Sequence, residues 1–334
     1  MKVSVVCPFY NEEAIIVAAT KRMIAKLQSQ LDDWELIMVN DGSRDQSLEV
    51  LLGALDVQRV DRVRVVSCSV NQGRGRALKN GIDAATGDII VTTEADCSWG
   101  DDIVERLVNE LHLYPESHFV VASPHLPGGG LVNVPLRRRL LTAIGNRLIR
   151  TFFITSVTMN TGMTRAYRRE VIQPLEVWES GKEFHLEVLL KLVGLGFRVR
   201  EIPAFITWQE HKLAAPGSAK RVSSTRIFKT IGTHLRFLAT AKPTQYFAIA
   251  AGLSLATGGT LIGWAFWNLL KGGPAIYLAI VGLLMLLFAL LFIGFSVFFV
   301  KLGEATRDQW LVPYRSAGSI PPSVLPAGQV FPPL

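Results

Sequence analysis

The first 125 residues alternate between short apolar runs and longer stretches with helical spacing. Five runs are short, rich in β-branched residues and largely apolar, as buried parallel strands are: Val3–Cys7, Glu35–Asn40, Val63–Ser67, Ile89–Thr93 and Phe119–Ala122. Four stretches between them are predicted as helices: Glu12–Leu31, Ser43–Leu55, Arg74–Ala85 and Asp101–Leu113. Strands that alternate with helices predict an α/β domain, in which a mostly parallel sheet carries helices on both faces.

Polar segments come directly after four of the predicted strands. Their sequences are "PFYNEE", "NDGSRD", "SVNQGRGRA" and "TEADCS". Because the carboxyl ends of parallel strands meet at one edge of a sheet, these side chains are expected to converge. This edge is where ligands bind on such sheets, so it is the predicted functional site.

The pattern loosens after Ala122. Residues 136–153 form a basic amphipathic stretch, with arginines on other faces than the apolar positions Leu140, Ile144, Leu148 and Phe152. Such a helix can lie in a membrane interface, or pack on the domain with a solvated basic face; the apolar character of residues 243–300 favours the membrane interface. Residues 221–243 form a second basic stretch, predicted to be a juxtamembrane helix.

Two long apolar runs occupy the C-terminal part of the chain. No residue is charged between Lys242 and Lys271, or between Lys271 and Lys301. Each run exceeds the roughly 20 apolar residues that span a bilayer core. A buried core helix is the alternative for one such run, but two in tandem joined by "KGGP" predict a transmembrane hairpin over residues 244–302. Residues 303–334 would form a tail whose Pro-rich end we expect to be poorly ordered.

Positive charge is unevenly distributed. The chain has 35 Lys and Arg against 28 Asp and Glu, a net charge of +7. Two stretches lack acids but contain several basic residues: those between Glu116 and Glu170, and between Glu210 and Glu304. The positive-inside bias predicts a multi-pass protein of the inner membrane, with the first 220 residues and both termini in the cytoplasm. Next to membrane spans, a basic surface indicates anionic lipid rather than nucleic acid as partner.

Acidic residues end two of the predicted strands. Asp41 lies in "VNDGSRD", and Glu94 and Asp96 lie in "TTEADCS". Carboxylates in such places hold Mg²⁺ or Mn²⁺ together with phosphate oxygens, or they cap the next helix. For Asp96 the metal interpretation is favoured, and for Glu94 both remain open. Further along the same loop, two acids are interpreted as first-turn residues favoured by the helix dipole: Asp101 and Asp102.

Two common nucleotide motifs are excluded. Gly73-x-Gly75 lacks the third glycine of a dinucleotide fingerprint, because Leu78 stands there, and it comes after the third strand rather than the first. The chain contains no GxxxxGK[ST] phosphate-binding loop.

The segments "VSVVCPFYNEE", "ELIMVNDGSRD", "NQGRGRALKNGIDAATGDIIVTTEAD" and "RAYRREV" resemble the inverting family 2 glycosyltransferases with a GT-A fold. With its hairpin, the chain is similar to polyprenyl-phosphate glycosyltransferases, which include dolichyl-phosphate mannose synthases and bacterial polyisoprenyl-phosphate glucosyltransferases. The resemblance implies a GT-A domain over residues 1–220. It also implies inverting transfer of a sugar from a nucleotide-diphosphate sugar (UDP or GDP) to polyprenyl phosphate, assisted by Mg²⁺ or Mn²⁺.

The resemblance also implies roles for individual residues. Nucleotide-sugar binding falls to Pro8, Tyr10, Asn11, Glu12, Asp41, Asn71, Gly73, Arg74 and Ala95. The expected metal ligands are Asp96, Glu94 and Ser98, and the expected catalytic set is Asp96, Glu94, Arg165 and Arg168, with both arginines near phosphates. Candidates for receiving the lipid phosphate at the membrane surface are Arg137, Arg138 and Arg139. Glu187 and "REIP", Arg200 to Pro203, have counterparts in the family as well.

Three positions depart from the pattern of the mannose synthases. Glu94 replaces the first aspartate of the acidic motif, Ser98 replaces a glutamine, and Pro124 with His125 stands where an arginine is usual. These changes affect the choice of sugar and nucleotide more than the reaction. His125 is either a substitute for that arginine or a surface residue.

Two other functions are compatible with parts of the sequence. A processive polysaccharide synthase of the same fold would carry a "QxxRW" element and more spans, and this chain has no such element. A non-catalytic membrane adaptor with a degenerate transferase domain is favoured by Glu94 and Pro124, but disfavoured by the retained Asp41 and Asp96. The sequence leaves the sugar, the base, the lipid length and the oligomeric state open, and it is compatible with a homo-oligomer.

Overall fold

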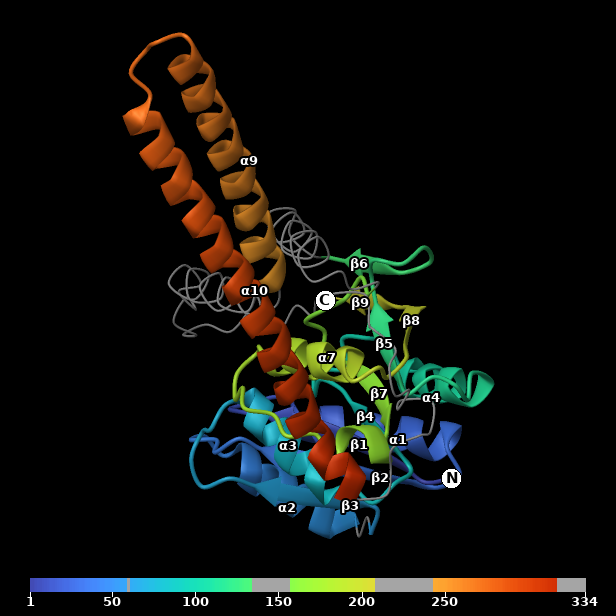
Figure 1. The fold of residues 1–334 in the computed structure, drawn as a ribbon. Coiled ribbons are helices and arrows are strands. Elements are labelled where there is room, and N and C mark those ends of the chain that lie inside the picture. The colour runs from blue at the N-terminus through green and yellow to red at the C-terminus, as the bar shows by residue number, and fades with distance from the viewer. Residues whose placement is uncertain (59–60, 134–156, 208–242, 317–334) are drawn as a thin grey trace. The chain divides into compact units, whose positions relative to one another are not determined.

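A computed structural model describes residues 1–58, 61–133, 157–207 and 243–316 (Figure 1). Within these residues, seven strands form one sheet in the order β3-β2-β1-β4-β7-β5-β8. Their bounds are β1 Val3–Phe9, β2 Trp34–Asn40, β3 Val63–Ser67, β4 Ile89–Thr92, β5 Phe119–Ser123, β7 Arg165–Arg168 and β8 Val199–Pro203. A separate pair consists of β6 Gly130–Val132 and β9 Phe205–Thr207, which run parallel.

The sheet is mostly parallel, as the sequence predicts. β1 pairs in parallel with β2 and β4, β2 with β3, and β5 with β8. The exception is β7, which lies antiparallel between β4 and β5. This strand is absent from the sequence-based prediction, since "RAYR" is four residues long and has no apolar run.

The helices predicted between the strands are present. They are α1 Ile16–Gln30, α2 Ser47–Gln58, α3 Arg74–Ala84 and α4 Ile103–Leu113. The first two begin about one turn later than predicted, because side chains bind the backbone of the preceding turns. The Ser43 hydroxyl accepts from the Asn11 N–H, and the Ser47 hydroxyl accepts from the Glu12 N–H. Such contacts offer the backbone an alternative to helical hydrogen bonds.

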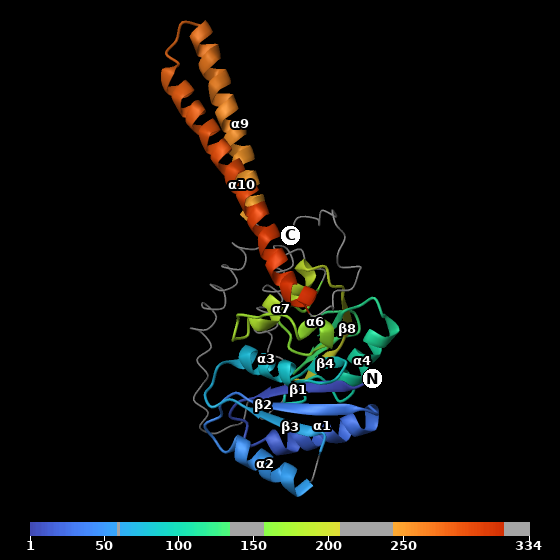
Figure 2. The same cartoon turned by 60° about the horizontal axis from the view of Figure 1, so that its bottom comes forward.

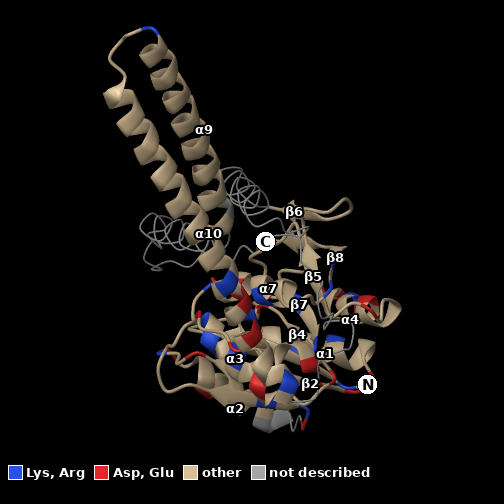
Figure 3. Ribbon diagram, viewed as in Figure 1, with Lys and Arg blue, Asp and Glu red and all other residues tan. Residues whose placement is uncertain are grey.

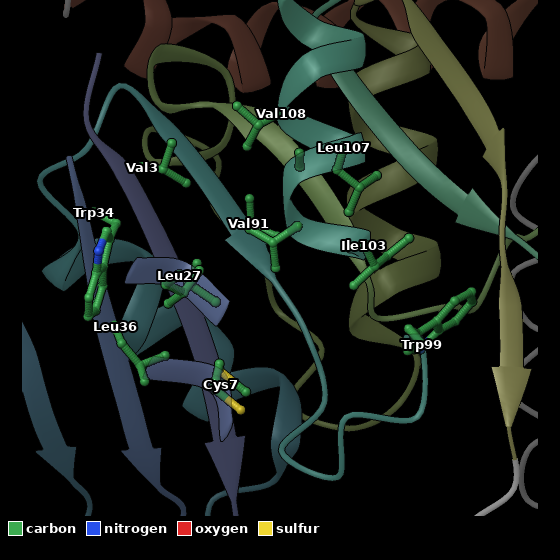
Figure 4. Packing of buried hydrophobic residues seen from close by; sticks show 14 of the residues in the cluster. Val3, Cys7, Leu27, Trp34, Leu36, Val91, Trp99, Ile103, Leu107 and Val108 are labelled. Atoms are coloured by element: carbon green, nitrogen blue, oxygen red, sulfur yellow. The ribbon is translucent and has the colours of Figure 1, made fainter. Parts of the chain in front are cut away.

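Helices cover both faces of the sheet. One face packs on α1 and α4 through residues such as Leu27, Val91 and Leu107 (Figure 4). The other face packs on α3, on α6 Arg169–Ile172 and on α7 Phe184–Gly194. Figure 2 shows α1 and α2 on one side of the strands and α3 on the other. This three-layer arrangement leaves the carboxyl ends of the strands as the edge at which loops gather.

Two further helices differ in character from the rest. α9 Pro243–Leu270 and α10 Ile276–Ser316 are long and apolar enough to cross a membrane. The colours of Figure 3 mark no Lys, Arg, Asp or Glu in α9 or in most of α10, apart from a basic residue at their turn. The described chain divides into two compact units, and the end of α10 from Trp310 belongs to the same unit as residues 1–207. The predicted amphipathic stretches, 136–153 and 221–243, lie outside the described residues apart from the first residue of α9.

Candidate functional site

The loops at the carboxyl ends of β1 and β2 are joined by hydrogen bonds. Asn11 adopts a left-handed conformation (φ 54°), and its side-chain oxygen accepts the Arg44 N–H at 2.8 Å. In return, the Ser43 hydroxyl accepts the Asn11 N–H at 3.0 Å. Pro8 pairs with Val39 in the parallel ladder, so Tyr10, Asn11 and Glu12 emerge at the same edge as the end of β2. The predicted nucleotide loop is therefore a fixed structure at the carboxyl edge.

Asp41 joins the loop after β2 to the loop after β3. One of its carboxylate oxygens accepts the backbone N–H groups of Gln72 and Gly73 at 2.9 and 3.2 Å, and the other accepts the Asn71 amide at 3.1 Å. Burial raises the pKa of Asp41, and the N–H groups of Gln72 and Gly73 only partly oppose this. The structure thus brings together three of the residues predicted to bind the nucleotide sugar: Asp41, Asn71 and Gly73.

The start of α3 is enclosed by a loop from much later in the chain. Gly73 has a φ of 98°, and a Cβ at this position would lie 2.4 Å from the Ser180 carbonyl oxygen. The Gly75 N–H donates to the same oxygen at 2.7 Å. Arg74 lies between these glycines, and its guanidinium is 3.8 Å from a carboxylate oxygen of Glu94. The two glycines are required here because of this close backbone approach.

The acidic loop after β4 is organised around Ser98. The Ser98 hydroxyl donates to Glu94 at 3.0 Å, and the Ser98 N–H donates to Asp96 at 3.0 Å. Ser98 and Ala95 are buried, whereas Glu94 and Asp96 are half-buried. The loop is also tied to β9, because the Thr207 N–H donates to the Ser98 carbonyl at 2.8 Å. Ser98 therefore orients both carboxylates; that Ser98 and Glu94 also bind a metal stays a prediction.

The other acids of this region have structural partners. Asp101 lies 2.8 Å from Arg22 and 3.5 Å from Lys26, and the hydrogen bond from Arg22 lowers its pKa. Asp102 is the N-cap residue of α4 and pairs with Arg106 at 3.7 Å. Both lie just before α4 rather than in its first turn as predicted, because the helix begins at Ile103 and Asp101 is bound to Arg22 and Lys26.

The donor set of the acidic loop fits a small divalent cation. Within the described residues, no group of three or more His, Cys, Asp and Glu side chains gathers at one point. Mg²⁺ does not need one, since it commonly binds one or two carboxylates and takes its other ligands from phosphates and water. Asp96 and Glu94 would supply such a pair of oxygen ligands two residues apart, and their binding of a metal stays a prediction.

Arg165 and Arg168 lie in different surroundings from those expected. Arg165 is fully buried and donates to the carbonyls of His185 and Asn160 at 2.8 and 2.7 Å. It pairs with Thr92, at the carboxyl end of β4 and next to the acidic loop. Its guanidinium is engaged by these two carbonyls, so it joins the start of α7 to the segment at Asn160.

Arg168 pairs with Ile89, the first residue of β4, and so lies at the opposite edge of the sheet from Asp96. It donates to three backbone carbonyls, those of Leu111, Pro115 and Ser117. The structure does not bring Arg168 together with the acidic loop. The phosphate contacts of both arginines stay predictions.

His185 is a buried group that no sequence pattern singled out. It lies in the first turn of α7 and has no exposed surface. Burial lowers its pKa well below the usual range, and the positive charges of Arg165 and Arg74 lower it further. The imidazole is therefore neutral at pH 7. Its position in "EFHLE", inside an apolar helix, carried no signal that set it apart from a core residue.

The REIP segment and the loop with His125 meet at Glu201. This carboxylate accepts the backbone N–H groups of Thr158 and Met159 at 2.8 and 2.9 Å. The Thr158 hydroxyl lies 2.6 Å from the Ser123 hydroxyl. The Ser123 hydroxyl also accepts the His125 N–H. Burial lowers the pKa of His125, although Glu201 opposes this. His125 is thus a half-buried member of the loop after β5. The predicted lipid-phosphate residues lie outside the described residues: Arg137, Arg138 and Arg139.

Curated relatives match about half of the chain. The undecaprenyl-phosphate 4-deoxy-4-formamido-L-arabinose transferase of Photorhabdus laumondii is 28% identical over 178 residues, which cover 52% of this chain and 51% of the relative. The enzyme of the same name from Yersinia pestis is 29% identical over 178 residues, with the same coverage. The chain spans about half the length of the curated relatives it matches.

A solved structure and a family model match as well. Glucosyl-3-phosphoglycerate synthase from Mycobacterium tuberculosis, in complex with Mn²⁺ and UDP-glucose, has a TM-score of 0.51 and 20% identity, covering 69% of this chain and 77% of that chain. At this identity the likeness concerns the fold. The model of glycosyl transferase family 2 matches residues 4–175, which include the sheet edge with Asp41, Glu94 and Asp96. The chain therefore belongs to glycosyl transferase family 2.

Proposed function

We propose that this chain transfers a sugar, with inversion, from a nucleoside-diphosphate sugar to a membrane polyprenyl phosphate at the cytoplasmic face of the inner membrane. The observation that carries the proposal is the gathering of Asp41, Arg74, Glu94 and Asp96 at one edge of the sheet. The same chain contains two helices long enough to cross a membrane. The names of the curated relatives support a polyprenyl phosphate as acceptor.

The donor would bind across the loops at the carboxyl ends of β1, β2 and β3. Asp41 and its partners hold these loops in one arrangement, so little ordering is needed when the nucleoside enters. The positive N-terminal end of α3 and the Arg74 guanidinium would stabilise the diphosphate as it departs. Asp96 and Glu94 would hold Mg²⁺ or Mn²⁺, which would neutralise diphosphate charge.

The acceptor determines what the protein must supply. A phosphate monoester has a second pKa of about 6, so a lipid phosphate is largely dianionic at neutral pH. Its oxygen can form the bond to the anomeric carbon while the bond to the diphosphate breaks on the opposite face, and no proton has to be removed. The chain therefore needs positioning and charge stabilisation rather than a strong base. We propose that Arg137, Arg138 and Arg139 receive the lipid phosphate.

The test is a transfer assay with the purified full chain in vesicles that contain polyprenyl phosphate. The donors are UDP- and GDP-sugars, with UDP-glucose and nucleotide-activated 4-deoxy-4-formamido-L-arabinose among them, each with Mg²⁺ or Mn²⁺. The expected result is release of nucleoside diphosphate, and labelled sugar in the lipid fraction, only when the lipid phosphate is present.

Two outcomes would contradict the proposal. Absence of transfer with every donor would favour the membrane adaptor. Growth of a labelled polymer without polyprenyl phosphate would favour a processive synthase.

Asp102→Asn is the matched control for variants of the acidic loop, because Asp102 is exposed and lies at the N-cap of α4 rather than beside Asp96 and Ser98.

A further inference from the structure

The end of α10 is built into the core of the transferase unit. Leu311 and Tyr314 are buried in the same apolar cluster as α3, α6 and α7. The Tyr314 hydroxyl donates to the Val171 carbonyl at 2.6 Å, and its ring lies 5.3 Å from that of Phe197. Val312, between them in sequence, is 57% exposed. The segment Trp310–Tyr314, here named the docking turn, therefore packs with one face.

A buried ammonium group connects the docking turn to α7. The Lys191 Nζ lies 5.3 Å from the centre of the Trp310 ring and 3.9 Å from that of Trp178. It also lies 2.7 Å from the Glu187 carboxylate and donates to the Glu176 carbonyl at 2.8 Å. Only 3% of Lys191 is exposed. A buried cation gains from contact with an indole ring, so Trp310 adds to the hold that Glu187 and the Glu176 carbonyl have on Lys191.

Glu187 extends this connection to the loop before α7. Its carboxylate accepts the backbone N–H of Trp178 at 3.1 Å and that of Glu179 at 2.8 Å. Glu187 is itself buried, so its charge depends on Lys191 and these two donors for compensation. Displacement of Lys191 would therefore loosen the segment Trp178–Ser180.

That segment forms the wall against which α3 begins. The Ser180 carbonyl accepts the Gly75 N–H at 2.7 Å, and the Glu179 carbonyl lies 2.7 Å from where a Cβ of Gly75 would be. Arg74 is thus held between two glycines that both touch this segment. We propose that the docking turn positions Arg74: Trp310 holds Lys191, Lys191 holds Glu187, and Glu187 holds Trp178–Ser180 against the start of α3. Trp310, Lys191 and Glu187 are positioning residues in this scheme.

The first test measures local opening and needs no substrate. Amide hydrogen exchange is measured in the full chain for three variants: Trp310→Ala, Trp310→Phe and Val312→Ala. In Trp310→Ala, exchange at Trp178, Glu179 and Gly75 should rise by roughly tenfold, because a desolvated cation–π contact contributes about this much to a local opening equilibrium. Trp310→Phe should restore most of the protection, and the exposed control Val312→Ala should leave it unchanged.

The second test rests on the proposed function. With a working donor, Trp310→Ala should lower kcat, because Arg74 is proposed to stabilise the departing diphosphate, while the apparent KM for polyprenyl phosphate stays the same. Trp310→Phe should again restore the wild-type value.

Two results of the exchange test would overturn the positioning scheme. One is unchanged exchange at Trp178–Ser180 in Trp310→Ala; the other is a rise in exchange in β1 and β2 as large as that at Trp178–Ser180. Absence of transfer in the wild type would overturn the proposed function, and leaves the exchange result to decide the scheme.

Discussion

The pKa of a buried carboxylate is shifted in opposite directions at the two edges of the sheet. At the amino edge, Glu35 accepts hydrogen bonds from the Ser4 hydroxyl and from the backbone and side chain of Thr86. Lys2 and Arg64 lie 3.4 Å from it. Burial alone would raise the pKa of Glu35, but the hydrogen bonds from Ser4 and Thr86 outweigh it and bring the pKa to about 2. The Glu35 carboxylate is therefore compensated by hydrogen bonds and ion pairs within the fold.

At the carboxyl edge, the effect of burial on a carboxylate pKa outweighs that of hydrogen bonds. Burial raises the pKa of Asp41 despite its hydrogen bonds, and the loop after β3 offers it N–H dipoles rather than a paired cation. Glu94 and Asp96 stay half-buried, with Ser98 orienting both. The difference supports the proposal that the acids at the carboxyl edge bind a ligand, whereas the acid at the amino edge stabilises the fold. Substitutions at each edge should therefore have separable effects on stability and on activity.

Asp96→Asn should have the largest effect. Loss of the charged oxygen ligand should lower the transfer rate by at least roughly 100-fold, because an amide binds a divalent cation far more weakly than a carboxylate does. The rate of lipid-dependent nucleoside diphosphate release measures this, with Asp102→Asn as the control. Full activity of Asp96→Asn would remove Asp96 from the metal site.

Asp41→Asn should separate binding from stability. The amide would present one oxygen to Gln72 and Gly73, and Asn71 can turn its own amide to match, so the fold is retained. Donor affinity should fall by roughly 30-fold, as expected for a lost hydrogen bond to a charged group.

The stability of Asp41→Asn should move in the opposite direction. Since the folded-state pKa of Asp41 is raised, its ionised form costs stability at neutral pH, and the urea midpoint should stay the same or rise. A midpoint that falls together with donor affinity would show that Asp41 is mainly a structural residue.

Glu35→Gln should affect the fold and leave the chemistry intact. The pKa of Glu35 is lowered from 4.5 to about 2 on folding, so the unfolded chain binds more protons between these values. The stabilisation is therefore complete above about pH 4.5 to 5 and is lost as the pH falls toward 2. Glu35→Gln should lower the free energy of unfolding at pH 7 by about 1–3 kcal/mol and flatten its fall with acid. Urea unfolding at several pH values measures both, and a changed donor KM would count against the contrast between the edges.

Among the substitutions at the carboxyl edge, Ser98→Ala should lower activity the least. The variant loses the hydroxyl that orients Glu94 but keeps the backbone N–H that binds Asp96. A fall in activity of roughly fivefold is expected, in line with the loss of one neutral hydrogen bond donor of about 1 kcal/mol. If activity falls as far as in Asp96→Asn, Ser98 is itself a metal ligand rather than a residue that orients Glu94.

Much of the fold could be predicted because local sequence patterns indicate most of its strands and helices. The run Val63–Ser67 predicts a buried parallel strand, and the structure has a parallel strand with the same bounds, although at the edge of the sheet it is only half-buried. The convergence of Asp41, Asn71 and Gly73 could be expected from topology, since parallel strands place their carboxyl ends at one edge.

The remainder depends on contacts that no local pattern carries. β7 is held by its two neighbours rather than by its own four residues, so its direction was not predictable from "RAYR". That direction places Arg165, rather than Arg168, beside Thr92 at the carboxyl end of β4. Likewise, nothing in "DQWLVPYRS" distinguishes a solvated tail from a helix end whose Tyr314 donates to a carbonyl 143 residues earlier in the chain.

The most direct test of the contrast between the edges compares metal-assisted nucleotide binding in variants of each. The affinities of the purified full chain for UDP and for GDP are measured with and without Mn²⁺, in the wild type, Asp96→Asn and Glu35→Gln. We expect Mn²⁺ to strengthen binding of one nucleotide in the wild type and in Glu35→Gln, but not in Asp96→Asn. An equal effect of Mn²⁺ in Asp96→Asn, or its loss in Glu35→Gln, would contradict the assignment of the carboxyl edge as the site.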